Sequence, residues 1–149
     1  MDHEYYMRLA LALAAEAAEA GEVPVGCVIV RDGEVIACGR NRREEKQATY
    51  SHAEMEAIAQ ANDVLGSWRL EDCSLYVTLE PCPMCAGAII NARIDRLVYG
   101  ASDAKAGSCG SVIDLFSLPY NYAPEVTRGV LAEEAAAQLK EFFRALRRE

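Results

Sequence analysis

Two short motifs, each at the start of an expected helix, constrain most strongly what this chain can fold into. His52 and Glu54 form the first, and Cys82 and Cys85 form the second, directly after Pro81. Zinc accepts one imidazole and two thiolates, and a catalytic zinc site leaves its fourth position to water. The positive end of a helix also favours thiolates over thiols. The two motifs therefore predict one metal site, with Glu54 within reach of the water at the fourth position.

Each motif taken alone has a plainer explanation. A C-x-x-C pair also serves as a redox dithiol or as half of a structural zinc site. A lone histidine is commonly a partly buried side chain with satisfied hydrogen bonds, and a lone Glu54 is commonly part of a solvated helix face. A redox pair needs no H-x-E motif, and a structural site needs a fourth protein ligand, for which Cys109 is the candidate. The joint pattern favours a catalytic zinc site.

The order of the expected elements predicts the fold class. Apolar periodicity predicts helices over 5–20, 52–64, 81–91 and 132–148, and strands over 23–31, 34–40, 75–79, 96–99 and 125–128. Asp32-Gly33 is a hairpin turn signal, 41–50 and 101–110 have loop composition, and 112–116 suits a short helix. This order predicts an α/β fold of three layers, α/β/α, with a central mixed sheet, formed by residues 1–149 as one domain. On the terminal helix we expect a buried face of Ala135, Leu139, Phe142 and Leu146.

The charge and composition limit the partners of the chain. Its 15 Lys and Arg residues against 23 Asp and Glu give a net charge of −8, which excludes a basic protein that coats nucleic acid. No apolar run approaches the roughly 20 residues of a membrane helix. The acidic N-terminus does not resemble a signal peptide, so we expect a cytoplasmic protein with no membrane partner and with reduced cysteines. Four of these we expect to be buried as small apolar side chains: Cys27, Cys38, Cys73 and Cys109.

An H-x-E motif followed by P-C-x-x-C is the signature of zinc nucleobase deaminases. The chain resembles one branch of that superfamily, the bacterial tRNA adenosine deaminases (TadA family), over nearly its whole length. The matching segments are 22–26, 41–42, 52–54, 65–71, 75–89 (LYVTLEPCPMCAGAI), 100–108, 129–131 and 142–144. The resemblance implies a cytidine-deaminase-like fold, one Zn²⁺ per subunit, a homodimer, and a tRNA anticodon stem-loop as partner. The implied reaction converts the wobble adenosine, at position 34 of tRNA(Arg), to inosine.

The same resemblance implies a role for each site residue. His52, Cys82 and Cys85 would hold the zinc ion, Glu54 would move protons, and Asn41 would hydrogen-bond the base. The other contacts to the flipped nucleotide would come from Val25, Ala53, Leu79 and Asp103. The contacts to the surrounding RNA would come from Lys105, Phe143, Arg144 and Arg147.

Several of these residues also have a structural interpretation. Asn41 follows a strand and suits a turn, and Asp103 suits a loop or cap carboxylate. Phe143 suits the core, and Arg144 and Arg147 suit a solvated helix end. The sequence alone leaves both interpretations open for these five positions.

Two residues depart from the family pattern. Tyr50 is bulky where small residues usually precede the first motif, and Tyr122 follows Asn121 where the family often has histidine. These changes affect the expected pocket entrance and an expected RNA-contact loop. Glu80, which stands beside Pro81, we interpret as structural.

Two other functions remain open at this point. A zinc deaminase of a free nucleobase or nucleoside, such as guanine or cytosine, shares the metal motif but has no need of Phe143 and Arg144 facing an anticodon. A non-catalytic zinc subunit that positions RNA typically lacks the proton-moving carboxylate, which is present here as Glu54. Because the net charge is −8, RNA binding requires a local basic patch, with candidates Lys105, Arg144, Arg147 and Arg148.

Overall fold

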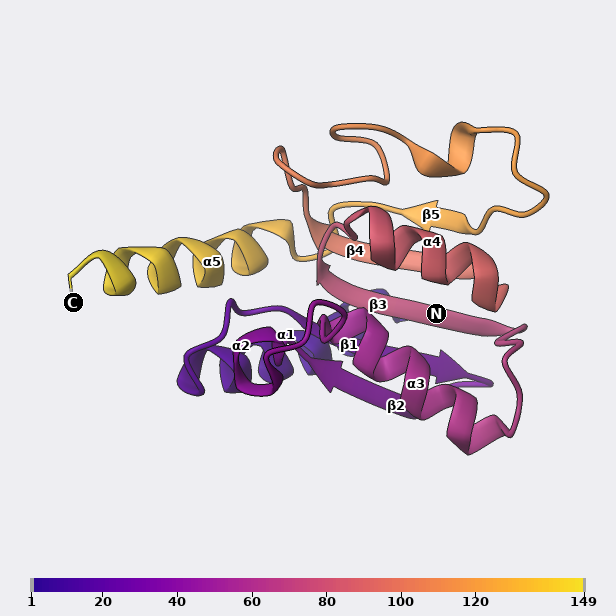
Figure 1. Cartoon of the computed structure of the whole chain (residues 1–149), viewed down its shortest axis with the longest axis horizontal. Coiled ribbons are helices and arrows are strands. Elements are labelled where there is room, and N and C mark those ends of the chain that lie inside the picture. The colour runs from indigo at the N-terminus through magenta and orange to yellow at the C-terminus, as the bar shows by residue number, and fades with distance from the viewer. Residues whose placement is uncertain (1, 149) are drawn as a thin grey trace.

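A sheet of five strands organises the chain. The computed structural model describes residues 2–148, and the strand order across the sheet is β2-β1-β3-β4-β5 (Figure 1). The elements in chain order are α1 His3–Glu19, β1 Gly26–Arg31, β2 Glu34–Arg40, α2 Arg43–Lys46, α3 Ala53–Leu65, β3 Cys73–Leu79, α4 Pro83–Ala92, β4 Arg96–Ala101, the 3₁₀ helix η1 Leu115–Ser117, β5 Glu125–Thr127 and α5 Ala132–Arg147.

The sheet is mixed, as the element order predicts. β1 pairs antiparallel with β2 and β3, whereas β3, β4 and β5 run parallel. Asp32 and Gly33 connect β1 to β2 with φ values of 52° and 77°, the positive values that a two-residue type I′ hairpin turn requires. Parallel neighbours need a crossover, and α4 supplies it between β3 and β4.

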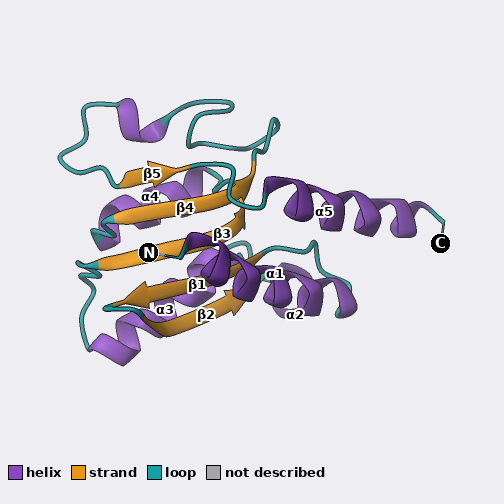
Figure 2. Cartoon of the chain, turned by 180° about the vertical axis from the view of Figure 1, so that it is seen from behind, coloured by secondary structure: helices purple, strands orange, loops and turns teal. Residues whose placement is uncertain are grey.

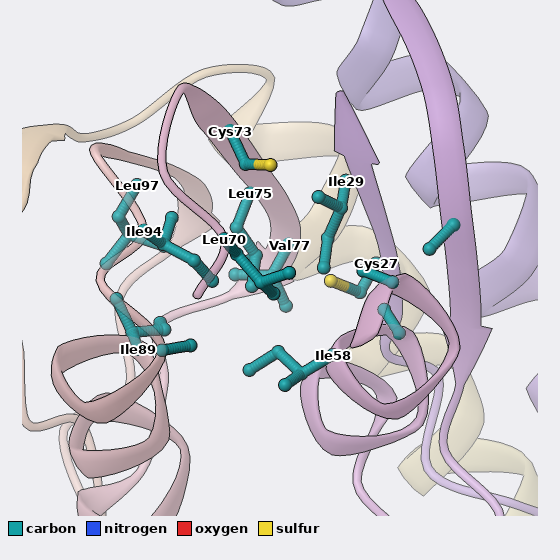
Figure 3. Packing of buried hydrophobic residues seen from close by; sticks show 14 of the residues in the cluster. Cys27, Ile29, Ile58, Leu70, Cys73, Leu75, Val77, Ile89, Ile94 and Leu97 are labelled. Carbon is teal, nitrogen blue, oxygen red and sulfur yellow. The ribbon is translucent and has the colours of Figure 1, made fainter. Parts of the chain in front are cut away.

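Helices cover both faces of the sheet, so the predicted three-layer α/β/α arrangement is confirmed. α3 and α4 lie on one face, and α1 and the first turns of α5 lie on the other (Figures 1 and 2). Figure 3 shows the first face, where Ile58 of α3 and Ile89 of α4 pack with Leu75 of β3. The next strand residue, Tyr76, packs with Met7 of α1 on the second face. This alternation along β3 follows the two-residue period of a strand.

Two glycines let helices approach the sheet unusually closely. A Cβ at Gly26 of β1 would lie 1.9 Å from the carbonyl oxygen of Ala10 in α1. A Cβ at Gly39 of β2 would lie 2.5 Å from the carbonyl oxygen of Ala53, the first residue of α3. The start of α3 is therefore held directly against β2, which fixes where the adjacent His52 stands relative to the sheet.

Three segments differ locally from the expected elements. The segment 41–50, expected as a loop, contains α2 because the buried Glu22 carboxylate accepts hydrogen bonds from the N–H groups of Glu44 and Glu45 at 3.0 and 2.6 Å. The helix expected from Pro81 begins at Pro83. The short helix expected over 112–116 is reduced to the 3₁₀ helix η1.

The terminal helix contradicts its expected burial. Of the four residues expected to face the core, Ala135 is buried, Leu139 and Phe142 are half-buried, and Leu146 is 52% exposed. The reason is that α5 packs on the sheet only near its start and then extends beyond the ends of the strands (Figure 2).

One of the four cysteines expected in the core is exposed. Cys38 lies on the edge strand β2, where its N–H donates to the Gln60 side chain of α3 at 2.7 Å. Cys27, Cys73 and Cys109 are buried as expected. Within residues 2–148, no helix has both the length and the apolar character needed to cross a membrane.

Candidate metal centre and substrate pocket

The two sequence motifs meet at two helix starts. His52 is the residue that precedes α3, and Cys82 precedes α4, both in extended backbone conformation, while Cys85 lies in the first turn of α4. The Nδ1 atom of His52 lies 3.6 Å from the Sγ atom of Cys82 and 3.6 Å from that of Cys85. The three ligand atoms lie within 4.8 Å of one another. The predicted grouping of these residues is therefore present in the structure.

The spacing of these atoms fits a tetrahedral zinc ion. Zinc bonds of about 2.3 Å to sulfur and about 2.0–2.1 Å to nitrogen, at a tetrahedral angle, separate the sulfur and nitrogen atoms by about 3.6 Å. Both measured separations are 3.6 Å. Among the described residues the cluster consists of these three side chains, and Cys109 is not part of it. A group of three candidate ligands fits a metal site, and a structural zinc site would require a fourth protein ligand.

The protonation of the cysteine pair is asymmetric without a metal. A hydrogen bond with Cys85 and a second one with His52 lower the pKa of the Cys82 thiol to about 4. The same hydrogen bond to Cys82, together with burial, raises the pKa of Cys85 well above its ordinary value. The bond to Cys82 also raises the pKa of His52. One thiolate is thus already favoured, and a cation between the sulfurs would favour the second.

Glu54 lies close to the start of α3, and water has very little access to its side chain. Its side chain is buried, with a residue exposure of 4%, in the first turn of α3. Burial raises the pKa of its carboxyl to about 7. A carboxyl whose pKa is near neutral both accepts and donates protons efficiently, which is the property that general acid–base catalysis requires.

A cavity of about 180 Å³ opens over this cluster. Pockets for drug-sized ligands start at about 300 Å³, so this volume suits a smaller group such as one nucleobase. The predicted residues that line it are Val25, Asn41, His52, Ala53, Glu54, Leu79, Cys82 and Asp103. They come from the start of β1, the ends of β2 and β3, the starts of α3 and α4, and the loop after β4.

Two of these lining residues also organise the backbone around them. The Oδ1 atom of Asn41 accepts a hydrogen bond from the N–H of Arg43 at 3.0 Å, and its Nδ2 atom donates to the carbonyl oxygen of Val23 at 3.3 Å. The Oδ1 atom of Asp103 accepts from the N–H groups of Lys105 and Ala106 at 3.0 and 3.3 Å. The turn interpretation of Asn41 and the loop-carboxylate interpretation of Asp103 are therefore confirmed. Both coexist with the position of these residues in the lining.

The residues expected to contact the surrounding RNA lie outside the pocket. Lys105 is exposed in the loop after β4. Phe143, Arg144 and Arg147 lie on the part of α5 that extends beyond the sheet, where Phe143 is 41% exposed (Figures 1 and 2). The core interpretation of Phe143 is wrong, whereas its neighbour Phe142 is half-buried.

The pocket also contains residues that the sequence interpretation does not place there: Val23, Arg43, Glu80 and Ala106. Glu80 is the one with a sequence signal, because a carboxylate between a buried strand and the first cysteine of the motif requires a special polar environment. The structure supplies that environment from a distant loop.

The two departures from the family pattern lie apart from the lining. Tyr50 is 63% exposed before α3. The Tyr122 hydroxyl lies 2.9 Å from the carbonyl oxygen of Ile94 and 2.9 Å from the Asp95 carboxylate. Tyr122 therefore connects the segment before β5 to the segment before β4.

Comparison with known proteins agrees with this geometry. A family model described as MafB19-like deaminase matches residues 1–147. The tRNA-specific adenosine deaminase of Bacillus subtilis (strain 168) is 49% identical over 146 residues, which are 97% of this chain and 91% of that protein.

Solved structures give the same result. A structure from a study of A-to-I editing by tRNA deaminases at the wobble position superposes with a TM-score of 0.89 at 48% identity, covering 91% of this chain and 99% of that one. A guanine deaminase from Bacillus subtilis superposes with a TM-score of 0.67 at 36% identity, covering 100% of this chain and 96% of that one. The motifs, the fold and the extent of these similarities together show that the chain belongs to the family of tRNA-specific adenosine deaminases.

Proposed function

We propose that residues 1–149 form one zinc-dependent deaminase domain that converts the wobble adenosine of a tRNA anticodon, in tRNA(Arg), to inosine. The observation that carries the proposal is the buried Glu54 carboxyl, which lines a cavity that suits one base together with His52 and Cys82, two members of the cluster with zinc spacing. Identity of 49% over nearly the whole chain to a tRNA-specific adenosine deaminase supports the choice of substrate.

The reaction needs a Lewis acid and a proton carrier. Zinc held by His52, Cys82 and Cys85 would supply the Lewis acid, which makes a water molecule acidic near neutral pH. Glu54 is placed to accept one proton from a water molecule as the water oxygen bonds to C6 of adenine, and to deliver this proton to N1. It would then take the proton of the new C6 hydroxyl and deliver it to the amino group as the C6–N bond breaks. Ammonia leaves, C6 becomes a carbonyl, and inosine remains.

The walls of the cavity orient the base. Leu79 and Val25 supply apolar surface, and the remaining polar capacity of Asn41 faces the same cavity. Asn41 uses one amide hydrogen and one oxygen lone pair for its own turn, so one donor and one acceptor are left for a base edge. An anticodon loop is already single-stranded, which lowers the free energy needed to move the base out of its stack.

A deaminase of free guanine is the second candidate, because a guanine deaminase shares the fold at 36% identity. The discriminating experiment incubates the zinc-loaded protein with an anticodon stem-loop carrying adenosine at the wobble position and measures nucleosides by mass spectrometry. Guanine, cytosine and free adenosine are tested in parallel. We expect inosine in the stem-loop alone. Turnover of a free base with unchanged RNA would replace the proposed substrate and keep the metal site.

The basic end of α5 provides a test of RNA contact. Arg147 is exposed in the last turn of a helix that extends past the sheet. We expect Arg147→Glu to weaken stem-loop binding and to reduce the slope of log affinity against log salt by about 0.7–0.9, the value of one phosphate contact. The measurement is a fluorescence anisotropy titration at several salt concentrations. Arg8→Glu on α1 is the matched control, and equal losses in both variants would contradict a specific contact.

The proposed active form is a cytoplasmic homodimer. α4 supports it, because its sequence PMCAGAIINA is apolar nearly throughout while Met84, Gly87 and Ala88 are only half-buried in the single chain. An apolar helix that its own chain covers incompletely suits a permanent interface.

A further inference from the structure

The loop of residues 102–111, which we call the Asp103 loop, is wrapped around one buried carboxylate. Glu80 is 2% exposed. Its Oε1 atom accepts hydrogen bonds from the N–H of Asp103 at 3.0 Å and from the Ser111 hydroxyl at 2.5 Å. Its Oε2 atom accepts from the N–H groups of Cys109 at 3.0 Å and Ser111 at 3.1 Å. The acceptor capacity of the carboxylate is thus largely used by one loop.

The loop is also packed against this side chain without spare room. A Cβ on Gly107 would lie 2.4 Å from the Cδ atom of Glu80 and 2.5 Å from the carbonyl oxygen of Asp103. The absence of a side chain at Gly107 therefore lets the backbone of the loop close over the carboxylate. Hydrogen bonds and packing independently indicate that the loop is built around Glu80.

The same loop forms a wall of the pocket and is fastened to the metal-ligand segment. Asp103 and Ala106 of the loop line the cavity together with Glu80 itself. The N–H of Ser108 donates to the carbonyl oxygen of Pro81 at 2.9 Å, immediately before Cys82. The connection from loop to metal centre therefore passes through two consecutive residues, Glu80 and Pro81.

We propose that Glu80 is a positioning residue for the deamination. Its carboxylate holds the Asp103 loop in place as a wall of the substrate pocket, at a fixed position relative to Cys82. The inferred effect of Glu80 on deamination kinetics rests on the proposed function. The inferred anchoring of the loop by Glu80 does not, because hydrogen exchange of the loop is measured on the protein without RNA.

Glu80→Gln is the sharpest test because it keeps size and shape. Glutamine has one acceptor oxygen and one NH₂ donor group, so in either orientation at least one backbone N–H of the loop faces a donor. On the zinc-loaded full chain we expect loss of hydrogen-exchange protection at the amides of Asp103, Cys109 and Ser111, with unchanged zinc content. We expect the stem-loop concentration at half-maximal rate to rise by about tenfold, while the rate at saturation changes by less than about threefold.

Two further variants separate positioning from general stability. Gly107→Ala leaves the carboxylate intact but displaces the loop, so it should reproduce both effects. Tyr76→Phe is the matched control on the same strand, because it removes a hydrogen bond of 2.8 Å to His3 on the opposite face of the sheet. It should lower the thermal midpoint without changing loop exchange or half-saturation.

Each result decides a separate statement. Unchanged exchange over 102–111 in Glu80→Gln would overturn the anchoring of the loop. Faster exchange with an unchanged half-saturating concentration would overturn its role in substrate positioning. If the unmodified protein left the stem-loop unchanged, the proposed function would fail, and the exchange data would still decide whether Glu80 holds the loop.

Discussion

Replacing Glu54 by glutamine should lower the rate of stem-loop deamination by a factor on the order of 10²–10⁴, the usual contribution of a positioned general acid–base group. Glutamine fills the same volume beside the ligand cluster but cannot accept a proton and return it. Glu54 is not one of the three residues whose ligand atoms form the cluster, so the zinc content should remain one ion per chain. The measurement combines single-turnover deamination with elemental analysis of the same protein sample.

Glu56→Gln is the matched control for this substitution. Glu56 lies two residues further along α3, where its carboxylate pairs with Lys46 at 3.0 Å outside the pocket. Both variants replace one carboxyl group of the same helix by an amide, but only Glu54 lines the cavity. Turnover near the unmodified rate in Glu54→Gln would rule out its role as the proton carrier.

Replacing Cys85 by alanine should remove both the zinc and the activity. Cys85 is buried in the first turn of α4, and its Sγ atom lies 3.6 Å from the His52 ring nitrogen. Its loss leaves one imidazole and one thiolate, too few protein ligands for a stable tetrahedral site. The measurements are zinc per chain after dialysis and deamination of the stem-loop.

The control for the thiol variant is Cys109→Ala. Cys109 is buried as well, but it does not belong to the ligand cluster, so this variant should keep its zinc. Metal content equal to that of the unmodified protein in Cys85→Ala would contradict the assignment of Cys85 as a ligand. Zinc loss from Cys109→Ala would point instead to a general loss of folding.

The predictions that succeeded depend on short-range patterns. The hairpin at Asp32-Gly33 follows from two residues that tolerate positive φ. The candidate ligands His52, Cys82 and Cys85 are recognised by residue type and by their spacing within two short motifs. The motifs lie 30 positions apart, so their meeting is inferred from the metal chemistry that they share, and the structure confirms that the three side chains lie together.

The features that sequence reasoning missed depend on contacts between distant segments. Helix α2 needs the Glu22 carboxylate, 22 positions before its first partner in the chain. The role of Glu80 needs donors up to 31 positions away. The hydrogen-bond partners of Glu22 and of Glu80 do not recur along the sequence with the period of a helix or a strand. Similarly, periodicity marks one face of α5 as apolar, but it does not tell how far the sheet extends beneath that face, and so it misplaces Leu146.

The first and the last turns of α5 differ in local stability, because only the first turns are packed against the rest of the chain. Its first turn is fixed by the buried Ala135, and the Gln138 side chain donates to the carbonyl oxygen of Leu11 in α1 at 2.9 Å. The turns from Phe143 onward are exposed and bury little apolar surface. They can therefore fray at a small free-energy cost while the sheet stays folded. A ligand that binds these turns must order them, and the chain entropy lost in this ordering lowers the affinity that is observed. A sequence with higher helix propensity in these turns would therefore bind the ligand more tightly without any new contact.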